Sequence, residues 1–234
     1  ASKQGIKVLL SGAGGDDIFT GYRRHAALQQ EYLWGWMPKS ARKLLKVTAE
    51  LFPADRASGR RIRKSFAYAD RSQNERICGY FHWLPEFWRA SILSESLRES
   101  LNLMPFSEPL MRSLGKAHDS RSPLSRMLYL EGKHFLADHN LNYTDKMSMA
   151  TGVEVRVPLL DRDLVNLVDS LPDQMKQKGL TGKWIFRKAM ENHLPNEVIY
   201  RSKTGFGAPL RHWLKHELRP MADDLLSDKS IINR

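Results

Sequence analysis

The sequence predicts a mainly α-helical fold with minor strand content. Apolar residues recur at helical spacing along much of the chain, as in Leu124–Phe135. Strand character is clearest in two short runs. Ile6–Leu10 has the β-branched and leucine content of a short buried strand, and Val153–Val157 alternates valine with charged side chains. After the first of these strands, we therefore expect the first half of the chain to be a helical scaffold.

The first strand leads into a glycine-rich turn that carries two carboxylates. The three glycines within Ser11–Gly15 can adopt backbone angles closed to other residues, so backbone N–H groups can face a ligand there. Asp16 and Asp17 stand where the next helix begins, and they either cap that helix or hold a divalent cation through hard carboxylate oxygens. The turn fits neither the dinucleotide fingerprint, because position 17 is Asp, nor the P-loop, because it has no lysine.

The scaffold that follows is divided by proline and glycine residues. The expected helices cover residues 22–32, 39–51 and 92–101, and a further helix begins at Pro123, which suits a first turn. In the second helix the apolar residues Leu44, Leu45, Val47 and Leu51 fall on roughly one face. The aromatic run Tyr80–Trp88 has mixed spacing, which favours packing between helices over a platform for stacking bases.

Composition limits the class of protein. Of the 234 residues, 41% are hydrophobic, so the chain can bury a substantial core. The net charge of +11 favours anionic partners, which include nucleic acid, anionic membrane, ATP and pyrophosphate. The single cysteine, Cys78, excludes an intrachain disulfide and favours a cytoplasmic location. No apolar run approaches the roughly 20 residues that span a bilayer, so we expect no membrane partner.

The second half of the chain carries a denser signal. A helix through Asp145, Lys146 and Met149 is expected to stop near Gly152. In the extended segment that follows, Glu154 and Arg156 share one face. If that face meets solvent, the pair contributes little to stability. If it lines a cleft, Arg156 could bind a carboxylate or a phosphate with its planar guanidinium group, and the pattern leaves both interpretations open.

Five segments, in order, resemble motifs of the synthetase domain of glutamine-dependent asparagine synthetases. They lie at residues 11–22, 145–161, 182–190, 194–195 and 203–209. The resemblance implies that this chain is the C-terminal portion of an adenine-nucleotide α-hydrolase-like (PP-loop ATP pyrophosphatase) α/β synthetase domain, whose other strands lie upstream. The start at Ala1, just before a strand with no evident partner, also suggests a piece of a longer protein.

The resemblance implies a two-step reaction that uses ATP and Mg²⁺. ATP adenylates the side-chain carboxylate of aspartate to β-aspartyl-AMP, and ammonia from a glutaminase domain missing here displaces AMP. By carry-over, Lys183 is the catalytic residue and neutralises charge, although without the motif it fits a solvated lysine in the first turn of a helix. Asp16 is implied to hold Mg²⁺. The nucleotide and substrate residues implied are Ser11, Gly12, Gly14, Asp16 and Asp17, with Lys146, Glu154 and Arg156 on the substrate side.

Several departures from the family pattern keep alternatives open. The Ser-Gly-Gly-x-Asp-Ser pyrophosphate loop is absent from these residues, so we expect the chain alone to be inactive. Ala13 stands where members often have an acid, Asp17 replaces the usual Glu, and Tyr143 stands where many have a basic residue. A relative that amidates another carboxylate, in polysaccharide or natural-product biosynthesis, is the alternative enzyme. The charge and the basic segment Arg56–Lys64 also permit a nucleic-acid-binding helical module.

The expected organisation has four parts. Residues 1–22 form the strand, acidic turn and helix start; 23–122 the helical scaffold; 123–214 the segment that bears the site; and 215–234 a tail. The first strand is expected to have an open edge, which either pairs with another chain, as in a homodimer, or is covered by a helix.

Overall fold

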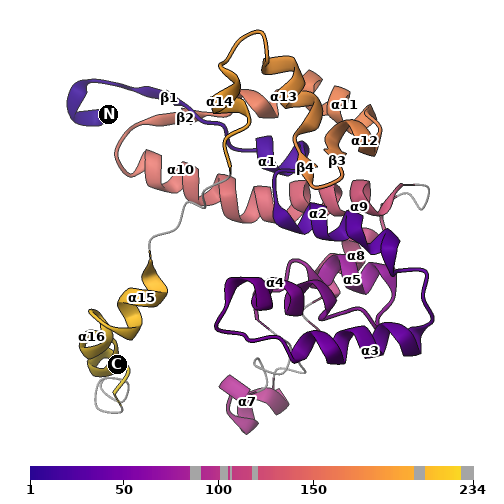
Figure 1. The fold of residues 1–234 in the computed structure, drawn as a ribbon. Coiled ribbons are helices and arrows are strands. Elements are labelled where there is room, and N and C mark those ends of the chain that lie inside the picture. Colours follow the sequence, from indigo (N-terminus) through magenta and orange to yellow (C-terminus); the bar gives the residue numbers. More distant parts are fainter. Residues whose placement is uncertain (85–90, 101–104, 106, 118–120, 203–208, 228–234) are drawn as a thin grey trace. The chain divides into compact units, whose positions relative to one another are not determined.

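The computed structural model describes residues 1–84, 91–100, 105, 107–117, 121–202 and 209–227 (Figure 1). It is mainly helical with little strand, which confirms the coarse fold class expected from the sequence. The chain divides into two compact units, residues 1–190 and residues 191–234. Among the described residues, no helix has both the length and the apolar character needed to cross a membrane.

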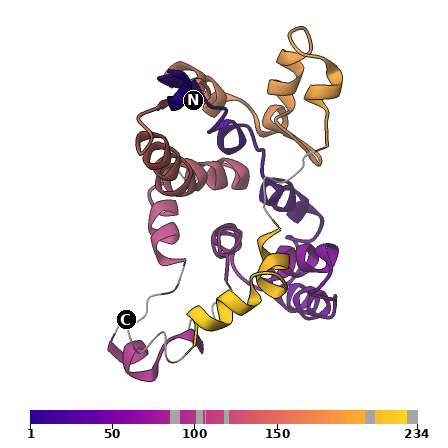
Figure 2. The same ribbon diagram turned by 90° about the vertical axis from the view of Figure 1, so that its left-hand side faces the viewer.

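The two strand-like runs pair with each other. Strands β1 (Val8–Leu10) and β2 (Glu154–Arg156) are parallel, with Val8 opposite Glu154 and Leu10 opposite Arg156. The indigo N-terminal segment lies beside the β2 segment in both views (Figures 1 and 2). The expectation that the first strand is buried is wrong: all three β1 residues are exposed, and Leu10 is 75% exposed. Within the described residues, β1 is hydrogen-bonded to one strand, so its other edge is unpaired there.

The expected helical scaffold is present in the first half of the chain. Before it lie η1 (Ser2–Gln4) and α1 (Gly15–Ile18). The scaffold itself consists of α2 (Arg23–Gln29), η2 (Gln30–Leu33), α3 (Lys39–Glu50), α4 (Ala57–Phe66), α5 (Gln73–Gly79), α7 (Glu95–Ser100) and α8 (Glu108–Leu114). The helix expected over residues 39–51 is present as α3, but its apolar residues are not covered: Leu44, Val47 and Leu51 are exposed and Ala49 is the buried residue of this helix.

The core of the first unit gathers residues from α2, α5, α8 and the helix α9 (Pro123–Leu130). The buried cluster consists of Leu28, Ile77, Cys78, Tyr80, Leu114, Met127 and Leu130. Tyr80 thus packs in the core, as expected for the start of the aromatic run. Trp83 is 72% exposed, however, and the rest of the run after residue 84 lies outside the described residues. The burial of these largely apolar side chains between helices is the main stabilising contribution to this unit.

A continuous helix leads from the core to the strand pair. It consists of α9 (Pro123–Leu130), the π-helical segment η3 (Glu131–Leu141) and α10 (Asn142–Met149). Pro123 occupies the first turn as expected, and the Ser122 side chain caps the helix by accepting a hydrogen bond from the Ser125 backbone N–H at 3.0 Å. The helix ends as expected before Gly152, whose φ of 65° is the left-handed conformation that glycine adopts readily.

The remainder of the first unit forms short elements after β2. They are η4 (Pro158–Leu160), α11 (Arg162–Ser170), α12 (Asp173–Lys176), β3 (Gln177–Lys178), β4 (Thr181–Gly182) and α13 (Trp184–Met190). Asp161 caps α11 by accepting hydrogen bonds from the backbone N–H groups of the first turn. β3 and β4 form an antiparallel hairpin. The second unit contains α14 (Asn196–Ile199), α15 (Leu210–Lys215) and α16 (Arg219–Leu225).

Candidate active site

The structure joins the acidic turn to the hairpin through an ion pair between Asp16 and Lys183. Lys183 Nζ lies 2.9 Å from Asp16 Oδ1, and the two side chains are 27% and 32% exposed, respectively. Asp16 lies in the first turn of α1 but makes no side-chain cap, because Gly14 is the N-cap residue. The expected helical position of Lys183 is wrong. Lys183 precedes α13, its φ is 56°, and its backbone N–H donates to Phe19 O at 2.7 Å.

Backbone strain gathers at this junction. Thr20 (φ 63°) and Lys183 (φ 56°) are the two non-glycine residues with positive φ in the part of the chain that the structure describes. Such a conformation costs on the order of 1–3 kcal/mol and persists only where the surroundings enforce it. Here the Thr20 hydroxyl donates to Lys176 O at 2.8 Å, and Lys183 is held by Phe19. The strain is therefore stored where the two charged side chains meet.

Two glycines allow the segments to approach this closely. A Cβ atom at Gly182 would lie 2.0 Å from Thr20 O, and one at Gly21 would lie 1.6 Å from Asp16 Oδ1. Both distances are far below van der Waals contact, so only glycine fits without movement of the backbone or of the Asp16 side chain. These positions explain why glycine stands in the acidic motif and in the lysine motif.

The glycine-rich turn itself continues from the end of β1. The Ser11 backbone N–H donates to Arg156 O at 2.8 Å, and the Ser11 hydroxyl accepts from the Ala13 backbone N–H at 3.2 Å. Gly14 has a φ of 87°, and a Cβ there would meet the Leu160 side chain at 2.3 Å. Gly12, in contrast, faces open space. The turn is thus fixed on its Leu160 side and open at Gly12.

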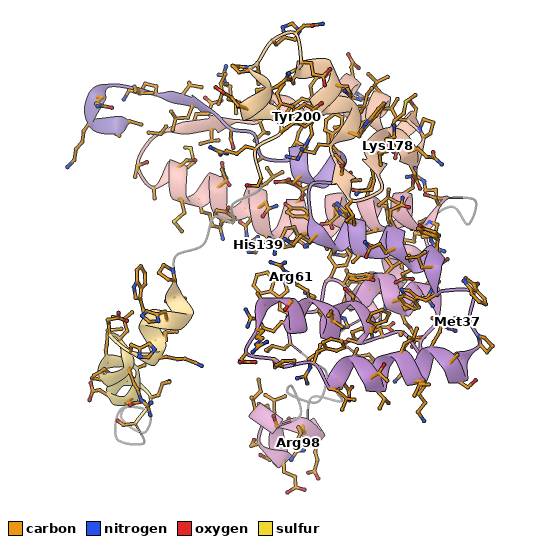
Figure 3. The ribbon with its side chains drawn as sticks, in the orientation of Figure 1. Met37, Arg61, Arg98, His139, Lys178 and Tyr200 are labelled. Atoms are coloured by element: carbon orange, nitrogen blue, oxygen red, sulfur yellow. The ribbon has the colours of Figure 1, made fainter. Side chains whose placement is uncertain are left out.

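The structure places the predicted substrate residues on the surface. Arg156 Nε donates to Glu154 Oε1 at 2.8 Å, and this hydrogen bond lowers the pKa of Glu154 and raises that of Arg156. Their side chains are 55% and 62% exposed, so of the two open interpretations the described chain shows the solvent-facing pair. Lys146 and Tyr143 on α10 are also exposed. His139, labelled in Figure 3, makes a T-shaped contact with the Tyr143 ring, with centroids 5.4 Å apart.

Asp16 and Asp17 are neighbours in sequence but have different surroundings. Asp17 is 2% exposed. The Tyr22 hydroxyl lies 3.3 Å from both of its carboxylate oxygens, and Asn140 Nδ2 lies 3.4 Å from Oδ1. Burial and the nearby Glu131 carboxylate raise the pKa of Asp17 to about 6, although the hydrogen bond from Tyr22 opposes this shift. Asp17 therefore belongs to a buried hydrogen-bonded group.

Glu131 is the second buried carboxylate of this region. It accepts hydrogen bonds from Arg24 Nε and Nη2, and its Oε1 lies 2.9 Å from His25 Nε2. Burial alone would raise the pKa of Glu131, but the hydrogen bonds from Arg24 and His25 lower it. Neither Glu131 nor Asn140 stands out in the sequence, because their partners are determined by the π-helical segment η3 that carries both.

Of the residues at this junction, the carboxylate of Asp16 is the group that fits a Mg²⁺ ligand. Mg²⁺ is usually held by one or two carboxylates together with phosphate oxygens and water. The partly exposed carboxylate of Asp16 fits that role, and the ammonium group of Lys183 stands beside it. Among the described residues, no three His, Cys, Asp or Glu side chains gather as a self-contained metal site.

Comparison with known proteins agrees with these motifs. The family description "Asparagine synthase" matches residues 1–233. The chain belongs to the asparagine synthase family. It is 29% identical over 232 residues to asparagine synthetase (glutamine-hydrolyzing) 1 of Bacillus subtilis (strain 168), which covers 97% of this chain and 34% of that protein.

Other relatives extend the comparison. A putative asparagine synthetase (glutamine-hydrolyzing) of Mycobacterium bovis is 27% identical, with 92% of this chain and 31% of that protein covered. The amidase chyE of Penicillium rubens is 24% identical, with 97% and 36% covered. The chain thus spans about a third of the length of these relatives. No solved structure matches it.

Proposed function

We propose that this chain is the C-terminal portion of a PP-loop-type α/β synthetase domain and takes part in the ATP-dependent amidation of a carboxylate. The observation that carries the proposal is the ion pair between Asp16 and Lys183. This ion pair joins the acidic turn to a lysine that is distant in the sequence. The backbone at the junction is strained at Thr20 and Lys183, and Gly21 and Gly182 leave no room for a Cβ atom. Membership of the asparagine synthase family supports the same reaction class.

The roles of the two residues follow from their charges. In the proposed reaction the acceptor carboxylate attacks the α-phosphorus of ATP, pyrophosphate leaves, and ammonia then displaces AMP from the acyl-adenylate. Asp16 holds Mg²⁺, which when bound neutralises negative charge on the phosphate oxygens. Lys183 stabilises the charge that develops as the acyl-adenylate forms and breaks down. The backbone of Ser11, Gly12 and Gly14 lines the nucleotide side of the site.

We propose aspartate as the acceptor, with Lys146, Glu154 and Arg156 beside it. These three side chains are exposed in the described chain, so the proposal requires further residues to complete the acceptor pocket. A different carboxylate is the second candidate. It is favoured by Ala13, which lacks an acidic group in the turn, and by Tyr143, whose aromatic ring is 53% exposed beside His139. Ammonia would come from a glutaminase domain, and the reaction would take place in the cytoplasm.

The test measures pyrophosphate release by the full-length gene product with ATP, Mg²⁺ and aspartate. Lys183→Ala should lower kcat at least about 100-fold, the scale found when one fixed donor to a developing charge is removed. The matched control is Lys178→Ala. Lys178, labelled in Figure 3, lies on the same hairpin with its Nζ 4.8 Å from the centre of the Trp184 ring, and its loss should change kcat less than threefold.

The substrate proposal is separated from the reaction class in the same assay. If pyrophosphate release depends on aspartate, the result supports asparagine formation. If the rate is unchanged by aspartate but rises when another carboxylic acid is added, the result supports the second candidate. Wild-type rates with Lys183→Ala would refute the assignment of Lys183. The isolated chain, which lacks the pyrophosphate loop, should bind ATP weakly and form no asparagine.

A further inference from the structure

The long helix that leads to the strand pair contains an unusual register. η3 (Glu131–Leu141) is π-helical over 11 residues, between α-helical turns on both sides. π-helical turns are rare, usually occur as single-turn bulges, and are frequently found at functional sites. Here the segment packs against α1, which carries Asp16 and Asp17 of the acidic turn (Figure 1).

The π register places two polar residues on the same side of this helix. Glu131 and Asn140 are nine positions apart, which in an α-helix of 3.6 residues per turn corresponds to two and a half turns and therefore to opposite faces. In the wider π-helix, with i→i+5 hydrogen bonds, nine residues return close to the same face. Accordingly, Glu131 binds Arg24 and His25, while Asn140 reaches Tyr22 and Asp17.

Asn140 completes a three-membered hydrogen-bonded group. Its Nδ2 lies 3.1 Å from Tyr22 Oη and 3.4 Å from Asp17 Oδ1, and the Tyr22 hydroxyl lies 3.3 Å from both oxygens of Asp17. The Tyr22 ring is fixed in turn, because it packs edge-on against Phe135 and beneath the Arg24 guanidinium group, 4.2 Å from the ring centre. A buried carboxylate requires such donors, and the helix supplies one of them.

This group holds the short segment that carries Asp16. α1 has four residues, and the Asp17 backbone N–H donates to Gly14 O at 3.0 Å, while Gly21 N–H donates to Asp16 O at 2.7 Å. On its other side the segment is held by Lys183 N–H, which donates to Phe19 O. The turn is thus held between η3, through Asp17, and the β4–α13 junction, through Phe19.

We propose that Asn140 is a positioning residue for the synthetase site, and that the π register of η3 exists to present it to Asp17 and Tyr22 so that the adjacent Asp16 is held opposite Lys183. The expected effect of Asn140 on the reaction rate rests on the proposed function. Its hydrogen bonds to Asp17 and Tyr22 do not. Asp17 acts in this arrangement through its hydrogen bonds to Tyr22 and Asn140 and does not touch the substrate.

The kinetic test uses the full-length protein. Asn140→Asp preserves shape but places a second carboxylate against Asp17, which should displace the turn and lower kcat for pyrophosphate release about 10- to 100-fold, as misplacement of about 1 Å does. The apparent affinity for Mg²⁺ should fall, whereas KM for the acceptor should change less than twofold. The matched control is Asn142→Asp, two residues further on, where the exposed side chain donates to Asp138 O at 3.3 Å; its rate should be unchanged.

The double variant Asp17→Asn with Asn140→Asp exchanges the amide and the carboxylate. It restores one donor and one acceptor to the pair, so it should recover kcat to within about threefold of the wild type. A rate for Asn140→Asp within twofold of the wild type would overturn the inference. So would a loss that the exchange fails to recover, because Asn140 would then act otherwise than through Asp17.

A spectroscopic readout separates this inference from the proposed function. In ¹H–¹⁵N spectra, the side-chain NH₂ signals of Asn140 are assigned by their loss in Asn140→Leu. They should shift in Tyr22→Phe, which removes only the hydroxyl group, whereas those of Asn142 should not. If the chemical shifts of the Asn140 side chain are the same in Tyr22→Phe and the wild type, the inference fails, whether or not the protein releases pyrophosphate. If they shift but the wild type releases no pyrophosphate from ATP, the contacts hold and it is the proposed function that fails.

Discussion

The buried carboxylate of Asp17 should make the stability of the protein depend on pH in a defined direction. Burial and the neighbouring Glu131 raise the pKa of Asp17 from 3.8 to about 6. The folded protein therefore binds this proton more tightly than the unfolded chain does. Asp17→Asn removes the charge but retains a carbonyl oxygen that can accept the hydrogen bond from Tyr22.

The magnitude follows from the size of the shift. Below about pH 4, Asp17 is protonated in both states, and the stabilising contribution of its bound proton is fully present. As the pH rises from about 4 to 6 the unfolded chain ionises first, and that contribution is lost. Above about pH 6 a shift of about two pKa units, at 1.36 kcal/mol each, destabilises the fold by about 3 kcal/mol. The Asp17→Asn variant avoids this cost, but its amide fits the hydrogen bonds of the site less well than the carboxylate does. That mismatch offsets about 1 kcal/mol of the gain in stability.

The expected result is that Asp17→Asn is more stable than the wild type by about 2 kcal/mol at pH 7.5 and has no advantage at pH 4. Urea unfolding followed by tryptophan fluorescence at pH 4, 5, 6 and 7.5 measures this difference. Asp55→Asn, at an exposed position, is the control and should be neutral throughout. A variant that is less stable than the wild type at pH 7.5, or an advantage that persists at pH 4, would refute the reasoning.

Three further experiments test the packing of the first unit, at the site and in its core. Gly182→Ala should destabilise the first unit by about 1–3 kcal/mol, the scale of overpacking, and lower activity with it, because a Cβ would lie 2.0 Å from Thr20 O. Gly132→Ala, where a Cβ meets open space, is the matched control in thermal unfolding. Arg24→Ala should cost about 3–5 kcal/mol in urea unfolding, because it leaves Glu131 buried without its guanidinium partner. The Cys78 thiol, whose pKa burial raises to about 12, should react with iodoacetamide at pH 8 only after unfolding, and rapid labelling of the native protein would contradict its burial.

The sequence was informative where a local pattern determines the structure. Pro123 predicted a helix start, Gly152 predicted a helix end, and the alternation in Val153–Val157 predicted a strand with Glu154 and Arg156 on one face. These features depend on a few neighbouring residues. Burial was predicted less well, because a leucine-rich run such as β1 is apolar whether or not another layer covers it, and α3 likewise exposes leucines that share a face.

The candidate site shows the same division. Motif resemblance singled out Asp16 and Lys183, and the structure brings them together. The residues on η3 that form hydrogen bonds with α1 and α2, Glu131 and Asn140, are not part of any motif. A search at a period of 3.6 places Glu131 and Asn140 on opposite faces of a helix and so separates two residues that the π register brings to the same side. The signal that would have found them is chemical. A carboxylate and an amide on a helix that packs against other helices each need a hydrogen-bond partner, and Arg24 and Tyr22, more than 100 residues earlier in the chain, can supply it. Pairing buried polar groups with complementary donors across segments therefore adds information that helical periodicity alone does not contain.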